Sequence, residues 1–199
     1  EKVEGKPLEF KLCGVRPERY EGMVLEPFNR LYECRYMVYW PVVSPEKLKA
    51  QQEELARVER ERNALEAATA DKVICGEQQP ESDHFVQSEQ SRTGSQGNRH
   101  WRAADGAGWF SYRMKTNGCK VARLRVTYAA GGKDAAATVS VDGQAAGILG
   151  QPDGKGMQTA FLDLPEGASG KDVLTVRFAP SGKGSTPRVY EIRLLVADE

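Results

Sequence analysis

The chain has 199 residues, enough for one sizeable domain or two small ones, and its apolar content of 40% is ordinary for a globular protein. Its 28 basic residues equal its 28 acidic residues, so no net charge would attract nucleic acid or an anionic membrane surface. No apolar run approaches the roughly 20 residues that cross a bilayer, which excludes a transmembrane helix.

Residues 1–43 show a β pattern. Position 1 is Glu rather than Met and residues 1–8 are polar, so we expect the chain to begin inside a domain, with any targeting signal out of view. Apolar and charged residues alternate over 8–12, residues 23–25 form a short apolar piece, and residues 35–40 are aromatic and β-branched. Because two or three strands need a second layer to close a core, we predict the tail of an upstream β-sandwich.

A long helix is predicted next, over residues 44–72. Residues 44–46, Ser-Pro-Glu, combine an N-cap serine, a proline at the first helical position and an acidic residue at the positive end of the helix dipole. Four apolar residues fall on one narrow stripe: Leu48, Leu55, Val58 and Leu65. A coiled coil is disfavoured, because Gln51 and Arg62 occupy seam positions. We therefore expect a linking helix that packs along a neighbouring domain.

Residues 73–199 show an all-β pattern, with turn signals roughly every 8 to 14 residues. Apolar residues alternate with polar ones in six stretches: 110–114, 122–128, 139–141, 162–164, 174–178 and 190–196. Asp142-Gly143 is a hairpin turn signal. The absence of alternating helices disfavours a parallel α/β fold. We predict a mainly β protein, in which one long α-helix and a few upstream strands precede an antiparallel β-sandwich of the jelly-roll type.

The cysteines give no sign of a metal site. Cys13, Cys34, Cys75 and Cys119 lie far apart without a C-x-x-C pair, so neither a zinc ribbon nor a thioredoxin-type motif can form locally. We expect buried free thiols. A disulfide between Cys13 and Cys34 stays open as an alternative if the protein is exported.

Polar and aromatic residues crowd into residues 76–112. Four acidic residues there offer the two carboxylates that glycoside hydrolysis needs: Glu77, Glu81, Asp83 and Glu89. Acidic residues in an exposed loop are usually only solvated, so we do not expect catalysis. Asp83, His84 and Glu89 could also gather around a calcium ion. The simpler alternative for His84 is a hydrogen-bonded loop histidine.

Trp109 has the opposite parity to Phe110, Tyr112 and Met114, which directs it away from the core. An outward tryptophan can stack on a sugar ring, while nearby polar groups fix the orientation of the sugar. We predict a carbohydrate-binding surface that comprises Trp101, Arg102, Trp109, Tyr112 and His84. The alternative is that Trp101 and Trp109 pack against the helix or against another domain.

Several motifs together carry a family resemblance. Residues 25–40, LEPFNRLYECRYMVYW, are followed by a charged helix, then G-E-Q-Q-P-E-S-D-H, Q-S-E and G-W-F-S-Y. This order resembles the C-terminal, non-catalytic region of β-L-arabinofuranosidase-type glycoside hydrolases (families 127 and 146) of gut Bacteroidetes, over almost the whole chain. The resemblance implies a secreted, periplasmic or extracellular enzyme of polysaccharide degradation, in which an (α/α) barrel does the chemistry and β-sandwich domains follow.

The same resemblance argues against chemistry in this segment. The family uses a zinc-held cysteine nucleophile set near an adjacent Cys-Cys pair, and no such pair occurs here. We therefore assign no catalytic residue and no zinc.

Residues 73–199 also resemble galactose-binding-like carbohydrate-binding modules, in which a Glu of an E-x-E-like segment helps to hold structural calcium. Glu89 in Q-S-E matches that position, although Gln87 replaces the first acid. The resemblance implies a structural calcium at Glu89 and no other cofactor. We expect an accessory domain that binds a plant-type glycan or braces the catalytic domain of the parent enzyme. The alternatives are a purely structural domain without a ligand and an independent glycosidase.

Overall fold

The computed structural model describes all of the chain except residues 7, 16–17, 28–42, 133, 151–155 and 198–199. It separates into two compact units, Glu1–Glu53 and Glu54–Glu199. In the first unit, β1 (Phe10–Lys11) pairs antiparallel with β2 (Val24–Leu25), and the 3-10 helix η1 (Glu18–Tyr20) lies between them in sequence. Both strands fall on apolar pieces that predicted them. The strand predicted at residues 35–40 and the cysteine at position 34 lie outside the described residues.

Helix α1 spans Pro45–Ala67, which confirms the predicted long helix. The backbone N–H of Lys47 donates a hydrogen bond to Ser44 Oγ at 3.3 Å, so the serine acts as the N-cap. No described residue of α1 is buried, and Leu48, Leu55 and Val58 of the apolar stripe are all exposed. The packing of this stripe on a neighbouring domain stays a prediction. Neither α1 nor any other described helix is long and apolar enough to cross a membrane.

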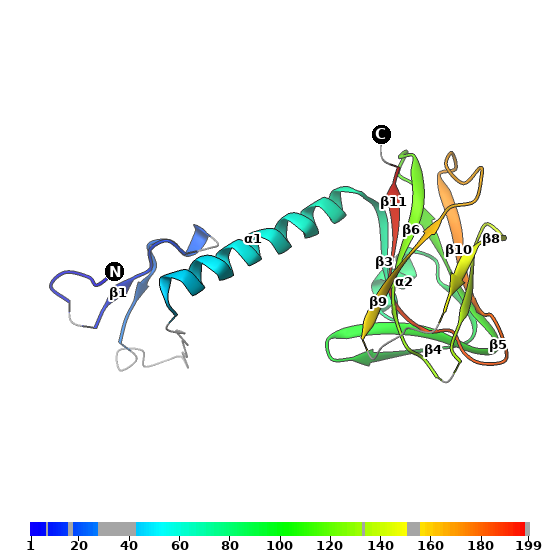
Figure 1. Cartoon of the computed structure of the whole chain (residues 1–199), viewed down its shortest axis with the longest axis horizontal. Coiled ribbons are helices and arrows are strands. Elements are labelled where there is room, and N and C mark those ends of the chain that lie inside the picture. Colours follow the sequence, from blue (N-terminus) through cyan, green and yellow to red (C-terminus); the bar gives the residue numbers. More distant parts are fainter. Residues whose placement is uncertain (7, 16–17, 28–42, 133, 151–155, 198–199) are drawn as a thin grey trace. The chain divides into compact units, whose positions relative to one another are not determined.

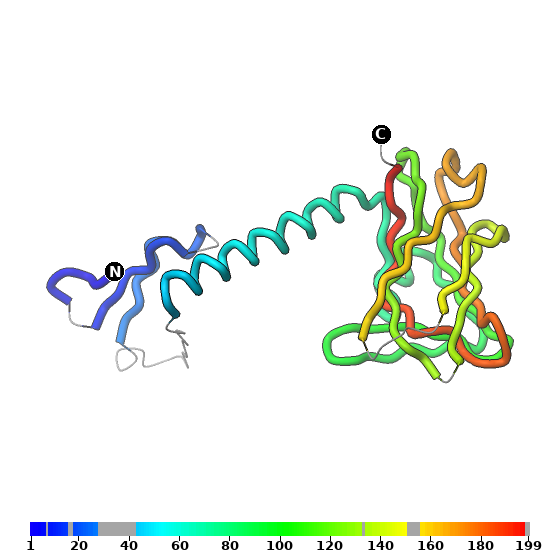
Figure 2. The backbone as a smooth tube through the Cα atoms, in the orientation of Figure 1, coloured from blue at the N-terminus to red at the C-terminus, as the bar shows by residue number. Residues whose placement is uncertain are grey.

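The second unit is built on nine described antiparallel strands, with the short helix α2 (Gln78–Asp83) after the first of them. The strands are β3 (Thr69–Ile74), β4 (Gln87–Gln96), β5 (Arg99–Lys115), β6 (Val121–Ala129), β7 (Ala137–Val141), β8 (Gln144–Leu149), β9 (Met157–Asp163), β10 (Val173–Pro180) and β11 (Arg188–Val196). Their order is β8-β7-β10-β5-β11-β6-β9, with β3 also paired to β11 and β4 to β5. Figures 1 and 2 show the strands curling around a common interior.

Strand β5 takes part in both layers of this sandwich. Its C-terminal half pairs with β10, whereas Arg102 near its start pairs with Val189 of β11. Between the two halves the β4–β5 ladder shifts register, and Gln90 and Gly106 both have positive φ there. We call the layer of β8, β7, β10 and the second half of β5 the β10 layer. The layer of β9, β6, β11, β3 and the first half of β5 is the β11 layer.

The core lies between the two layers and is made by the alternating apolar residues. The following core side chains are at most 2% exposed: Val73, Phe110, Tyr112, Met114, Val121, Leu124, Val126, Val139, Val141, Leu174, Val176, Phe178, Ile192 and Leu194. The rings of Phe110 and Phe178 stack with their centroids 5.0 Å apart. A Cβ on Gly147 of β8 would lie 2.8 Å from Leu162 Cδ2 of β9, so the two end strands also meet. The predicted antiparallel β-sandwich is confirmed.

Three details differ from the sequence expectations. The sandwich begins at Thr69 rather than at residue 73, because β3 pairs with β11 from Leu195 to Glu191. Helix α2 and the polar strand β4 replace the exposed loop expected after Gly76. Among the described cysteines, Cys13, Cys75 and Cys119 are all free thiols, but only Cys75 is buried. The disulfide between Cys13 and Cys34 stays a prediction.

Candidate functional site

Two of the predicted carbohydrate-binding residues, Arg102 and Tyr112, lie in a buried polar cluster around Glu81. The Arg102 guanidinium donates two hydrogen bonds to the Glu81 carboxylate, at 2.7 and 2.6 Å, and the Tyr112 hydroxyl donates a third at 2.6 Å. Burial alone would raise the pKa of Glu81, but the bonds from Arg102, Tyr112 and the backbone N–H of Gly76 hold it below its ordinary value. Tyr112 is fully buried, so its hydroxyl faces Glu81 rather than solvent.

His84 is the hydrogen-bonded histidine of the simpler alternative. Its Nδ1 lies 2.6 Å from the carbonyl oxygen of Pro80, and its Nε2 lies 3.1 Å from Asp71 Oδ1. The hydrogen bond to Asp71 raises the pKa of His84 above its ordinary value, although burial opposes this shift. Both ring nitrogens therefore have partners inside the domain.

Trp101 lies on the outer face of the β11 layer and is covered by its own domain. It is 8% exposed and forms a small apolar cluster with Ala103, Ala129 and Tyr190. The guanidinium carbons of Arg92 and Arg188 lie 5.6 and 5.1 Å from its ring centroid. Its indole Nε1 is buried and has no hydrogen-bond partner among the described residues. Trp101 therefore does not present an exposed ring on which a sugar could stack.

Trp109 lies half-exposed on the outer face of the β10 layer, on the side of β5 that the sequence parity predicted. Its Nε1 donates a hydrogen bond to Glu89 Oε2 at 3.2 Å, and the guanidinium carbon of Arg177 lies 4.1 Å from its ring centroid. The strand register sets a polar row beside it, because Ser111 pairs with both Gln87 and Arg177. Ser140 of β7 continues the row beyond Arg177.

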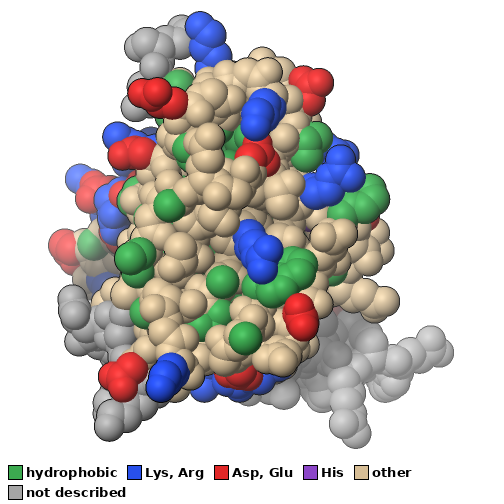
Figure 3. All heavy atoms as spheres, turned by 90° about the vertical axis from the view of Figure 1, so that its right-hand side faces the viewer, with side chains coloured by type: hydrophobic (Ala, Val, Ile, Leu, Met, Phe, Trp, Pro, Cys, Tyr) green, Lys and Arg blue, Asp and Glu red, His purple; other side chains and the backbone are tan. Residues whose placement is uncertain are grey.

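We call this surface the Trp109 face; it comprises Gln87, Glu89, Trp109, Arg113, Ser140, Thr175 and Arg177, with Ser111 buried between Gln87 and Arg177. Figure 3 views the molecule from the side of β8 and β10, where basic, acidic and apolar side chains lie next to one another. Such a surface offers a flat ring together with hydrogen-bonding groups, the combination that a sugar needs.

Glu89 does not have the surroundings of a calcium ligand. Calcium takes six to eight oxygen ligands, and no group of three metal-ligating side chains occurs among the described residues. Glu89 is exposed and its carboxylate accepts the Trp109 hydrogen bond. These residues alone do not fit the ion, and the structural calcium at Glu89 stays a prediction.

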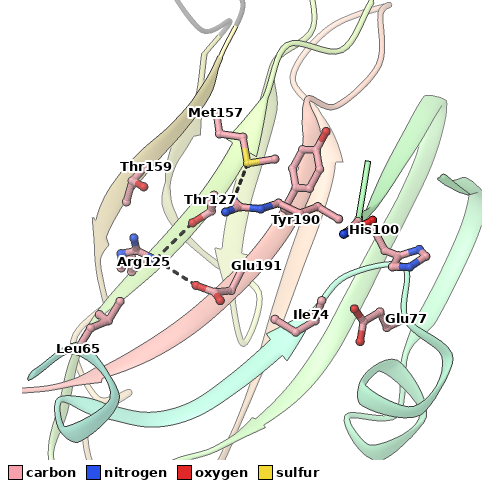
Figure 4. Close-up of a pocket in the computed structure, with 12 residues that line it drawn as sticks. Leu65, Ile74, Glu77, His100, Arg125, Thr127, Met157, Thr159, Tyr190 and Glu191 are labelled. Atoms are coloured by element: carbon pink, nitrogen blue, oxygen red, sulfur yellow. Dashed lines mark hydrogen bonds and ion pairs between the residues drawn. The ribbon is translucent and has the colours of Figure 1, made fainter. Parts of the chain in front are cut away.

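A groove of about 570 Å³ opens on the outer face of the β11 layer. Its lining residues come from seven segments of the chain: Leu65, Ile74, Glu77, Asn98, Arg99, His100, Arg125, Thr127, Met157, Thr159, Tyr190 and Glu191. Figure 4 shows Arg125 and Glu191 in the middle of the groove, with His100 and Glu77 together on one side. No sequence signal marked this groove, because its residues share neither a motif nor a regular spacing.

The four acidic residues considered for glycoside hydrolysis do not meet in one cleft. Only Glu77 lines the groove, where the second carboxylate is that of Glu191. Glu81 is buried in its ion pair, Asp83 accepts a hydrogen bond from Gln79, and Glu89 lies on the β10 layer. Glu191 is bound by Arg125 and Arg193, at 3.0 and 2.7 Å. The arrangement therefore offers no pair of free carboxylates for an acid and a base.

Comparison with protein families gives two matches. Residues 64–195 match a family described as "Family of unknown function (DUF6805)", and residues 1–42 match a "Domain of unknown function" (DUF4986). No curated protein matches the sequence.

Solved structures with a similar fold include a family 35 carbohydrate-binding module from Clostridium thermocellum. It has a TM-score of 0.46 and 15% identity, over 56% of this chain and 92% of that chain. An exo-β-1,3-galactanase from Phanerochaete chrysosporium has a TM-score of 0.45 and 15% identity, over 64% of this chain and 29% of that chain. The C-terminal family 6 carbohydrate-binding module of a laminarinase from Zobellia galactanivorans has a TM-score of 0.42 and 10% identity, over 62% of this chain and 97% of that chain.

Proposed function

We propose, for a chain that belongs to the Family of unknown function (DUF6805), that the β-sandwich is a non-catalytic accessory domain that binds carbohydrate on the Trp109 face. The observation that carries this proposal is the half-buried Trp109 beside a row of polar residues on the outer face of the β10 layer. An aromatic ring contacts the C–H face of a sugar, and neighbouring polar groups bind its hydroxyls.

The neighbours of Trp109 suit this role. Arg177 stacks on the indole ring and Glu89 holds its N–H, so the ring is fixed in orientation before a sugar arrives. A fixed ring loses little conformational entropy on binding, which favours affinity. Gln87 in the row and Arg113 of β5 are both exposed and supply an amide and a guanidinium to sugar hydroxyls.

For the parent protein we propose a secreted, periplasmic or extracellular glycoside hydrolase of the β-L-arabinofuranosidase type that degrades a plant-type polysaccharide. The support is the resemblance over residues 25–40 and the motifs that follow α1. We also propose that the exposed stripe of Leu48, Leu55 and Val58 packs against another domain of that enzyme. An apolar stripe of this kind gains free energy when it is covered.

Titration of the 199-residue chain with plant cell-wall oligosaccharides, arabino- and xylo-oligosaccharides first, tests the proposal through tryptophan fluorescence. We expect a saturable change that Trp109→Ala removes, with at least about a tenfold loss of affinity by calorimetry. Phe161→Ala is the control, because Phe161 is an exposed aromatic residue on β9 of the other layer.

The outcomes separate the alternatives. A flat response for the wild type would favour a purely structural domain. A response that persists unchanged in Trp109→Ala would move the carbohydrate site away from this face.

A further inference from the structure

We propose that the groove on the outer face of the β11 layer is a second saccharide site, which takes a neutral, hydroxyl-rich sugar independently of the Trp109 face. Its volume of about 570 Å³ falls within the range of small-molecule sites, roughly 300 to 1,000 Å³. All of its lining residues belong to the unit Glu54–Glu199. The two sites lie on the outer faces of opposite layers.

The floor of the groove is held together by hydrogen bonds between charged side chains. Arg125 Nη1 donates hydrogen bonds to Glu191 at 3.0 Å and to Thr127 at 3.3 Å. Arg193 donates to the same Glu191 carboxylate at 2.7 Å, and Arg193 is 6% exposed. These hydrogen bonds fix the positions of the Glu191 carboxylate and the Thr127 hydroxyl, which can then bind a ligand in the groove.

The rim carries groups whose hydrogen-bonding capacity is not used. The side chain of Arg99 donates its one described hydrogen bond to the sulfur of Met157, which is a weak acceptor. Neither Glu77 nor His100 makes a side-chain hydrogen bond with any described residue, and Figure 4 shows both side chains on the same side of the groove. A sugar hydroxyl is a better acceptor than a thioether and can also donate to Glu77, so binding would replace weak contacts by stronger ones.

The charges of the lining favour a neutral ligand. Arg99 and Arg125 are balanced by Glu77 and Glu191, so the groove presents donors and acceptors without an excess of either sign. A carboxylate-bearing sugar would gain Arg99 but would lie close to two carboxylates, which repel it. Leu65, Ile74 and Met157 add apolar surface for the C–H groups of a sugar ring.

Nuclear magnetic resonance of the 199-residue chain tests this site, with arabinobiose and xylobiose as neutral probes and digalacturonate as the acidic probe. The side-chain signals of Arg99 and His100 report on the groove, and no tryptophan is among its described lining residues. Trp101 lies next to the lining residue Tyr190, so only the part of the fluorescence change that Trp109→Ala removes reports on the Trp109 face. The resonance signals report on the groove, so one proposal can fail while the other stands.

We expect a neutral disaccharide to shift both signals saturably. Arg99→Ala should weaken the binding at least tenfold, and Glu77→Gln by a smaller factor. Arg123→Ala is the matched control, since Arg123 is an exposed arginine of β6 paired with Asp163 outside the groove, and it should leave the affinity within twofold.

Three results would overturn the inference. They are the absence of a saturable shift with both neutral disaccharides, an affinity unchanged by Arg99→Ala, and tighter binding of digalacturonate than of either neutral probe.

Discussion

Glu81 links helix α2 to both layers, because it accepts hydrogen bonds from Gly76 next to β3 and from Arg102 and Tyr112 of β5. Removing one partner of a buried ion pair leaves the other charge without compensation. We predict that Glu81→Ala lowers the free energy of unfolding by about 3–5 kcal/mol, and that Tyr112→Phe, which removes one hydrogen bond, lowers it by about 1 kcal/mol.

Urea unfolding followed by circular dichroism measures both variants on the same chain. Equal losses for the two variants would show that the Arg102 ion pair adds nothing to stability beyond the single hydroxyl hydrogen bond.

The pair of His84 and Asp71 predicts a stability that depends on pH. The pKa of His84 is raised above its ordinary 6.5, so its contribution is complete below pH 6.5 and is lost as the pH rises through the folded-state value. Burial opposes the shift of Asp71, yet hydrogen bonds from His84 and from the backbone of Lys115 and Lys72 hold its pKa below 3.8. The contribution of Asp71 is therefore lost only in more acidic solution.

We predict that His84→Gln destabilises the protein more at pH 5.5 than at pH 9, measured as free energies of unfolding in urea. His100→Gln is the control substitution, because His100 is exposed and its replacement leaves the pair of His84 and Asp71 in place. A cost of His84→Gln that does not change with pH would mean that the charged form of His84 is not favoured by folding.

The packing of the Trp101 ring leaves no room for a side chain at position 94, which is glycine. The two residues face each other across β4 and β5, and a Cβ on Gly94 would lie 2.3 Å from Trp101 Cζ2. Overpacking of this kind typically costs about 1–3 kcal/mol. We expect Gly94→Ala to lower the melting temperature clearly, whereas Gly182→Ala, where a Cβ would meet nothing within 4 Å, should change it little. Similar melting temperatures for both variants would contradict this packing.

Among the elements, those with a period in their sequence could be predicted. Alternation over Phe110–Met114 and over 122–128 predicted β5 and β6, and the Ser-Pro-Glu start predicted α1. Strand β4 could not be predicted in the same way, because QSEQSRTGSQ has no apolar alternation. Its backbone is held instead by the ladder with β5 along its length.

The candidate sites also divide into one that a local sequence pattern indicates and one that no such pattern indicates. Trp109 was found by its parity on one strand. The parity of Tyr112, the same as that of Phe110 and Met114, already indicated a buried ring. The groove could not be found from the sequence, because residues as distant as Glu77 and Glu191 become neighbours only through the pairing of the strands. Short-range pattern does not encode that pairing.

Strand β3 is part of the sandwich, although it follows α1 directly. It pairs with β11 through Glu191–Leu195, and Val73 is fully buried. We predict that a fragment of residues 54–199 keeps the cooperative thermal unfolding of the whole chain, and that a fragment of residues 75–199 loses it or melts far lower. Differential scanning calorimetry measures both fragments. Equal melting temperatures would show that β3 is dispensable to the core.

At the scale of the whole sandwich, the two proposed sites face away from each other. Trp109 lies outside the β10 layer, whereas Arg125 and Glu191 lie outside the β11 layer. One sugar ring cannot contact both. Two separate segments of one glycan chain could occupy the two sites. Because the segments are linked, the overall affinity rises above that of either site alone without any new contact.

Strand β5 has a consequence for how the sandwich comes apart. Since its first half is paired in one layer and its second half in the other, neither layer can peel away while β5 stays in place. Destabilising one layer therefore destabilises the other, and the buried backbone becomes exposed only when the whole domain unfolds. A sandwich that opens only as a whole offers a protease no partly unfolded half to cleave.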